Sequence, residues 1–201
     1  MFNPLGPHAR EFMALASGAL SAVNVVVYLL SVWRGKTRPH MYSWIIWALV
    51  PAVVGAAQIA SNGGVGGWST LVSVLTAGIV ALVAAFRGEK AITRGDRLCL
   101  AGCVVAILLW PLTRDPLASV VLITAIDLVG FYPSVRKSLH KPWEESASGY
   151  VLFGTRSFMV CAALTEWRLV SVVYPLLMGL ACFVFAGFLA LRRRAMGRAA
   201  G

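Results

Sequence analysis

Seven apolar runs separated by short loops make up most of this 201-residue chain. They span residues 13–33, 41–60, 68–86, 98–112, 117–135, 147–164 and 169–191. Most runs approach the roughly 20 residues that a helix needs to cross a bilayer. Hydrophobic residues form 59% of the chain, more than a soluble domain of this size needs for its core. The sequence therefore predicts an all-α membrane protein with seven transmembrane helices in a single membrane domain, residues 1–201.

The basic residues are distributed unevenly among the loops. Fourteen of the eighteen Lys and Arg residues lie after the first, third and fifth runs or in the C-terminal tail, whereas the other side holds three. Cytoplasmic loops carry an excess of positive charge. We therefore expect an inner (cytoplasmic) membrane protein with its N-terminus outside and its C-terminus in the cytoplasm. The net charge of +10 then reflects topology, and we expect the bilayer, not nucleic acid, as the partner.

An internal repeat is found when the sequence is aligned with itself at an offset of 103 residues. Asn24 then coincides with Asp127, and the first run coincides with the fifth. The interpretation is a three-helix repeat at 13–86, a linker helix at 98–112 and a second three-helix repeat at 117–191. Because both copies would have the same orientation, an extra crossing must join them. The result is a parallel 3+1+3 arrangement, a type of repeat found in transporters.

One stretch carries a resemblance to a known family. Its residues are Asp127-x-x-Gly130-x-x-Pro133-Ser134-x-x-Lys137, followed by Pro142 and Glu144. With the seven runs, this pattern resembles the PQ-loop and SWEET superfamily, especially small bacterial members. The resemblance implies two three-helix bundles and transport of small solutes. Where the family has Pro-Gln this chain has Pro133-Ser134, so the resemblance implies the fold more strongly than a sugar substrate.

Three polar residues fall near the middle of their runs: Asn24, Asp127 and Arg156. A charged residue at this depth costs roughly 2.5–3.5 kcal/mol on insertion scales and therefore needs a partner or a wet cavity. Arg156 is the natural partner for Asp127, with Tyr132 or Tyr174 nearby. Two interpretations stay open: the three residues line a cavity that binds a polar or cationic solute, or Asp127 and Arg156 form a closed bridge.

Pro51 in the second run and Pro133 in the fifth run are hinge candidates because proline interrupts helical hydrogen bonding. In the basic loops, Glu144 and Glu145 are expected to form exposed ion pairs with Lys137 or Lys141. The two loop histidines, His40 and His140, are expected to be solvated.

No nucleophile–His–acid set and no cluster of metal ligands can be assigned from the sequence. We therefore expect neither an enzyme nor a bound cofactor or metal. The leading hypothesis is a small-solute transporter or facilitator that binds a small polar solute near the midplane. The alternative is a non-transporting membrane protein that binds a lipid or a protein partner. A homo-oligomer is compatible with either.

Overall fold

Helices occupy every predicted apolar run in the computed structural model, which describes residues 3–60, 65–109, 112 and 116–199. The elements are α1 (Pro7–Trp33), α2 (Met41–Ala60), α3 (Val65–Arg87), α4 (Arg94–Leu109), α5 (Pro116–Val129), α6 (Phe131–Ser138), the 3-10 helix η2 (Pro142–Glu144), α7 (Ala147–Ala163) and α8 (Leu169–Ala199). No β-strand occurs in these described ranges. The all-helical prediction is confirmed, although residues 110 and 111 of the fourth run lie outside the described residues.

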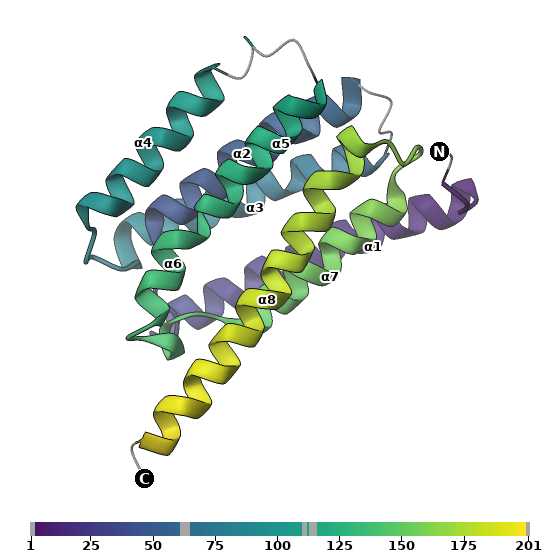
Figure 1. The fold of residues 1–201 in the computed structure, drawn as a ribbon. Helices are drawn as coiled ribbons and strands as arrows, with labels where there is room; N and C mark the ends of the chain where they lie inside the picture. The colour runs from purple at the N-terminus through teal and green to yellow at the C-terminus, as the bar shows by residue number, and fades with distance from the viewer. Residues whose placement is uncertain (1–2, 61–64, 110–111, 113–115, 200–201) are drawn as a thin grey trace.

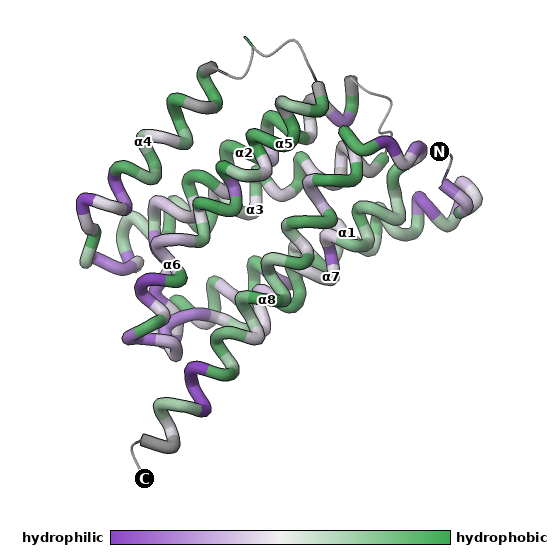
Figure 2. The backbone as a smooth tube through the Cα atoms, viewed as in Figure 1, coloured by the Kyte–Doolittle hydropathy of each residue, from purple (hydrophilic) through white to green (hydrophobic). Residues whose placement is uncertain are grey.

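Three helices are long and apolar enough to cross a membrane within the described ranges. They are α1, the Thr70–Arg87 part of α3, and the Leu169–Gly197 part of α8. Large apolar side chains such as Leu15, Leu75 and Val184 are exposed on the outside of these helices. Exposed apolar surface on this scale marks a surface that contacts something other than water. The fold is that of a helical membrane protein, and Figure 2 shows the apolar residues along its helices.

The predicted fifth run is broken into α5 and α6 at Gly130. Pro133 has no N–H for the carbonyl of Val129, and its ring crowds that carbonyl. The Gly130 N–H instead approaches both Ile126 O at 3.1 Å and Asp127 O at 3.0 Å, which tightens the last turn of α5. The break therefore precedes the predicted hinge residue by three positions. Pro51, the other hinge candidate, lies inside an uninterrupted α2.

The helices pack in two groups that meet along two seams. In the first group α3 contacts both α1 and α2, and in the second α8 contacts both α5 and α7. The seams are α1 against α7 and α2 against α5, while α4 lies outside against α2, α5 and α6 (Figure 1). The largest buried apolar cluster includes Ile46, Ile123 and Leu189 from α2, α5 and α8.

The loops after α1, α3 and α6 gather at one end of the bundle. Arg38 N–H donates to Glu144 O at 3.0 Å, and Glu89 N–H donates to Pro39 O at 3.0 Å. Hydrophilic residues concentrate there in Figure 2. At the C-terminal end of α7, by contrast, the Asn3 side chain donates to a backbone carbonyl at 2.8 Å. The basic loops that the charge pattern assigns to one side of the membrane thus lie at one end of the molecule, which we call the basic end.

Candidate functional site

A cavity of about 60 Å³ lies between the two helix groups, lined by residues of α1, α2, α3, α5, α6, α7 and α8. One water molecule needs about 10–15 Å³, so a cavity of about 60 Å³ has room for about four to six water molecules. Its wall is largely aromatic and includes Tyr28, Trp44, Trp47, Phe131, Tyr150 and Tyr174. Concave sites with apolar walls and a few polar groups are the usual form of a small-molecule binding site.

Asn24 of α1 lines this cavity. Its amide Nδ2 donates to the carbonyl of Gly149, in the first turn of α7, at 3.2 Å. Because that partner is an acceptor, the nitrogen must face it and the oxygen must point elsewhere. Oδ1 is buried and accepts no hydrogen bond from any residue that the structure describes.

Asp127, near the C-terminal end of α5, also lines the cavity and is 1% exposed. The Tyr174 hydroxyl on α8 donates to its Oδ2 at 3.0 Å. Its other carboxylate oxygen, Oδ1, is buried and accepts no hydrogen bond within the described part of the chain. The indole N–H of Trp47 lies 3.4 Å from the backbone carbonyl of Asp127 and joins α2 to the end of α5. Asp127 is therefore held by side chains from both helix groups.

Arg156 is buried on α7 but is not among the cavity-lining residues. Its guanidinium lies 5.5 Å from the ring centre of Phe153, which does line the cavity. The ion pairs of the described residues do not include a bridge between Arg156 and Asp127, which was one of the two interpretations left open by the sequence. Arg156 follows the cavity-lining Phe153 by three residues, so it lies within one helical turn of the wall without forming part of it.

Tyr132 does not line the cavity, contrary to the prediction. Its side chain is half exposed, and a Cβ on Gly95 of α4 would lie 3.4 Å from its hydroxyl. The neighbouring Phe131 faces the cavity instead. Successive helical residues point about 100° apart, so only one of the two can face inward. Tyr174, the other tyrosine that the sequence suggested, is the one that contacts Asp127.

Aromatic rings form a layer between the cavity and the basic end. The ring centres of Tyr28 and Trp44 are 4.9 Å apart, and those of Trp44 and Trp47 are 5.4 Å apart. Trp47 then packs on Phe131 at 4.8 Å. These separations fall in the range of favourable aromatic pairs. The layer connects α1, α2 and α6 across the bundle.

A buried ion pair lies directly beyond this layer. The Lys137 ammonium is 2.5 Å from Glu145 Oε1, and the two side chains are 2% and 1% exposed. Lys137 also donates to the carbonyl of Arg38 at 2.5 Å, and the hydroxyl of Tyr150 donates to Glu145 Oε2 at 3.1 Å. Burial raises the pKa of Glu145, an effect that the nearby ammonium partly offsets. The prediction that Glu145 forms an exposed ion pair was wrong, because the loops fold over this end.

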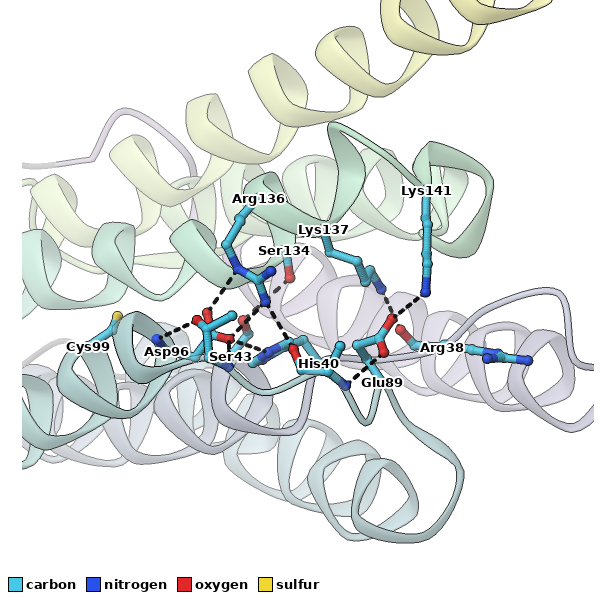
Figure 3. A network of polar contacts seen from close by, with 12 residues as sticks. Arg38, His40, Ser43, Glu89, Asp96, Cys99, Ser134, Arg136, Lys137 and Lys141 are labelled. Carbon is cyan, nitrogen blue, oxygen red and sulfur yellow. Dashed lines mark hydrogen bonds and ion pairs between the residues drawn. The ribbon is translucent and has the colours of Figure 1, made fainter.

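A second buried cluster joins the α1–α2 loop to α4 and α6 (Figure 3). Arg136 Nη2 is 2.8 Å from Asp96 Oδ2, and His40 Nε2 is 3.4 Å from the same oxygen. Burial alone would raise the pKa of Asp96, but hydrogen bonds from Thr93 and Arg136 and the nearby His40 lower it overall. Burial lowers the pKa of His40. His40 is fully buried, so its predicted solvation was wrong.

A third contact at the basic end pairs Lys141 with Glu89 at 3.4 Å. Burial of Glu89 acts to raise its pKa, but hydrogen bonding to Ala91 and the Lys141 charge lower it overall. Together the three contacts tie the loops after α1, α3 and α6 to one another. The residues of these pairs are 8 to 56 positions apart, so no common sequence spacing identifies the pairs.

Within the described residues, no group of three or more His, Cys, Asp or Glu side chains is placed to hold a metal ion. No protein-family model matches the chain, and neither a curated protein nor a solved structure gives a significant match. The functional inference therefore depends on the cavity and on the elements around it.

Proposed function

We propose that this protein is a small-solute transporter or facilitator whose binding site is the cavity between the two helix groups. The observation that carries the proposal is the placement of Asn24 and Asp127, one from each group, in the wall of one cavity. An ionisable residue kept inside a membrane domain commonly marks a solute or ion pathway. Transporters built from repeats place their sites at the interface between the repeats.

The proposed 3+1+3 repeat has support from the cavity wall and from the packing. Three pairs of lining residues are separated by 103 positions: Asn24 with Asp127, Tyr28 with Phe131, and Trp47 with Tyr150. In each proposed repeat the third helix, α3 or α8, contacts the other two. The seams also correspond, since the first helix of each repeat contacts the second helix of the other, α1 with α7 and α5 with α2. The resemblance to the PQ-loop and SWEET superfamily agrees with this arrangement.

In this proposal the basic end faces the cytoplasm, as its excess of Lys and Arg favours. The aromatic layer and the Lys137–Glu145 pair then separate the cavity from the cytoplasm. Access from that side requires the α1–α2 loop to move away from α6, which breaks the contact between Lys137 and the Arg38 carbonyl. The break at Gly130 and the proline at Pro51 are places where the helices can bend with little loss of hydrogen bonding.

The experiment that tests this proposal is uptake into proteoliposomes. A thermal-shift screen of the purified protein across sugars, amino acids, vitamins and amines selects the solute. Uptake of that solute is then compared among wild type, Asp127→Asn and Glu11→Gln, which removes an exposed acid of α1. We expect Asp127→Asn to abolish uptake and Glu11→Gln to leave it unchanged.

Two results would contradict the proposal in different ways. Uptake that is unaffected by Asp127→Asn would remove the carboxylate from the pathway. Binding of a solute without any flux in wild type would favour the alternative, a non-transporting protein that binds a lipid or a protein partner.

A further inference from the structure

We infer that the cavity around Asp127 and Asn24 selects a small organic ammonium ion, a primary or methylated amine with one to three carbon atoms. This inference rests on the proposed function, because it names the class of solute for the same cavity. It follows from three properties of the cavity wall: its hydrogen-bonding capacity, its charge and its aromatic content.

Three buried oxygens of the cavity wall have no hydrogen-bond partner among the described residues: Asn24 Oδ1, Asp127 Oδ1 and the Tyr28 hydroxyl, which can accept as well as donate. Asn24 uses its amide nitrogen on the Gly149 carbonyl, and the Tyr174 hydroxyl proton is used on Asp127 Oδ2. The oxygens Asn24 Oδ1 and Asp127 Oδ1 are buried and receive no hydrogen bond from the described residues. An ammonium group carries only donors, whereas a carboxylate carries only acceptors and a hydroxyl carries both. All three unpartnered oxygens can accept from an ammonium group, whereas only the Tyr28 hydroxyl among them can donate to a carboxylate or an alcohol. The wall therefore complements an ammonium group best.

The charge of the wall points to a cation as well. The described lining residues include one carboxylate, that of Asp127, and no Lys, Arg or His. Arg156 does not line the cavity, although it packs against Phe153, which does line it. A buried carboxylate gains from an opposite charge far more than an exposed one does, because little water screens the interaction. Burial disfavours the ionised form of an isolated carboxyl group, and an opposite charge close to it favours that form. A cation in the cavity can therefore pair with an ionised Asp127, which a neutral solute cannot do.

The aromatic wall favours a cation that carries alkyl groups. Tyr28, Trp44, Trp47 and Phe131 all line the cavity. A cation over an aromatic face is attracted to the negative face of the ring, by about 2 kcal/mol or more where water is excluded. Methyl groups on the nitrogen add apolar surface that such a wall can cover. An amine with a short alkyl chain thus satisfies the carboxylate and the rings together.

The volume favours a small ligand. The cavity measures about 60 Å³, whereas an apolar cavity of about 150 Å³ is of the size that admits benzene. Methylammonium and dimethylammonium fit within this space, whereas tetraethylammonium does not. Size therefore separates the expected ligands from bulky quaternary ions that carry the same charge.

The test is isothermal titration calorimetry of the full-length protein in lipid nanodiscs. Methylammonium chloride is titrated and compared with methanol, sodium acetate, tetraethylammonium chloride and sodium chloride at equal ionic strength. We expect methylammonium to bind at least tenfold more tightly than each of the other four. Asp127→Asn should weaken methylammonium binding at least tenfold, whereas Glu11→Gln should leave it unchanged.

The comparison among ligands in wild type does not depend on any variant. Equal binding of methylammonium and methanol, or no methylammonium binding at all, overturns the inference even if Asp127→Asn fails to fold. The outcomes also separate the inference from the proposed function. Uptake of a neutral solute without methylammonium binding refutes the inference alone, while methylammonium binding without flux of any solute supports it and refutes transport.

Discussion

The buried pair between Lys137 and Glu145 should be among the most strongly coupled interactions in this protein. Its side chains are 2% and 1% exposed, so removal of one partner leaves the other charge in a dry site. Such a change costs about 3–5 kcal/mol. We therefore expect Lys137→Met and Glu145→Gln each to lower the free energy of unfolding by about that amount.

The double variant should be far less destabilised than the sum of the two single variants. With both charges gone, the main remaining loss is the hydrogen bond from Lys137 to the Arg38 carbonyl. This hydrogen bond is only partly buried, so its loss costs no more than about 1–3 kcal/mol. Additive single effects would instead give about 6–10 kcal/mol, so the coupling energy should be about 3 kcal/mol or more.

The assay is reversible unfolding by SDS in mixed micelles, followed by circular dichroism for wild type, both single variants and the double variant. The matched control is the exposed pair Arg168–Glu166, whose side chains are 55% and 24% exposed. Surface pairs contribute about 0–1 kcal/mol, so the cycle on this pair should show little coupling. A coupling energy for Lys137 and Glu145 below about 1 kcal/mol would refute the burial argument.

Three further predictions address other parts of the fold, all measured by the same unfolding assay. Burial lowers the pKa of His40 from its ordinary 6.5, so on acidification the unfolded chain takes up a proton before the folded one, and the free energy of unfolding falls as pH drops below about 6.5. His40→Gln should reduce the loss of stability that wild type shows between pH 7.5 and 5.5. An unchanged dependence of stability on pH in this variant would contradict the prediction. A Cβ at Gly88 would meet two backbone oxygens at 2.4 Å, so Gly88→Ala should destabilise by about 1–3 kcal/mol, whereas Gly78→Ala, with open space around it, should be neutral or stabilising. Tyr174→Phe removes the hydrogen bond to the cavity carboxylate and should cost about 1.5–3 kcal/mol of stability. Tyr132→Phe at a half-exposed site should change stability by less than about 0.5 kcal/mol. Equal effects of the two variants would refute the placement of Tyr174, and not Tyr132, against Asp127.

The acidic residues of the basic loops have a structural role that charge counting alone conceals. Glu89, Asp96 and Glu145 are all buried, and each pairs with a Lys or Arg of α6 or of the residues that follow it. An excess of positive charge on this side therefore coexists with specific internal pairs. These pairs hold three loops in one layer, which lies beyond the aromatic wall of the cavity.

The positions of the helices could be predicted from the sequence because their causes are local. Apolar run length, a rise of 1.5 Å per residue and proline chemistry are properties of single segments. The predicted range 41–60 coincides with α2, and the predicted start at 147 coincides with the start of α7. The gathering of the basic loops at one end also follows from the alternation of crossings.

The partners of the polar side chains depend on how the helices pack. Asp127 meets Tyr174 and not Arg156, because the depth and rotation of α7 and α8 relative to α5 are set by side chains along the whole interface. Residues 40, 96 and 136 come together only because three loops fold onto one end of the bundle. Local sequence determines where a helix begins and which residues are apolar. Whether a charged side chain is buried, and which residue it then pairs with, depends on how the whole bundle is assembled.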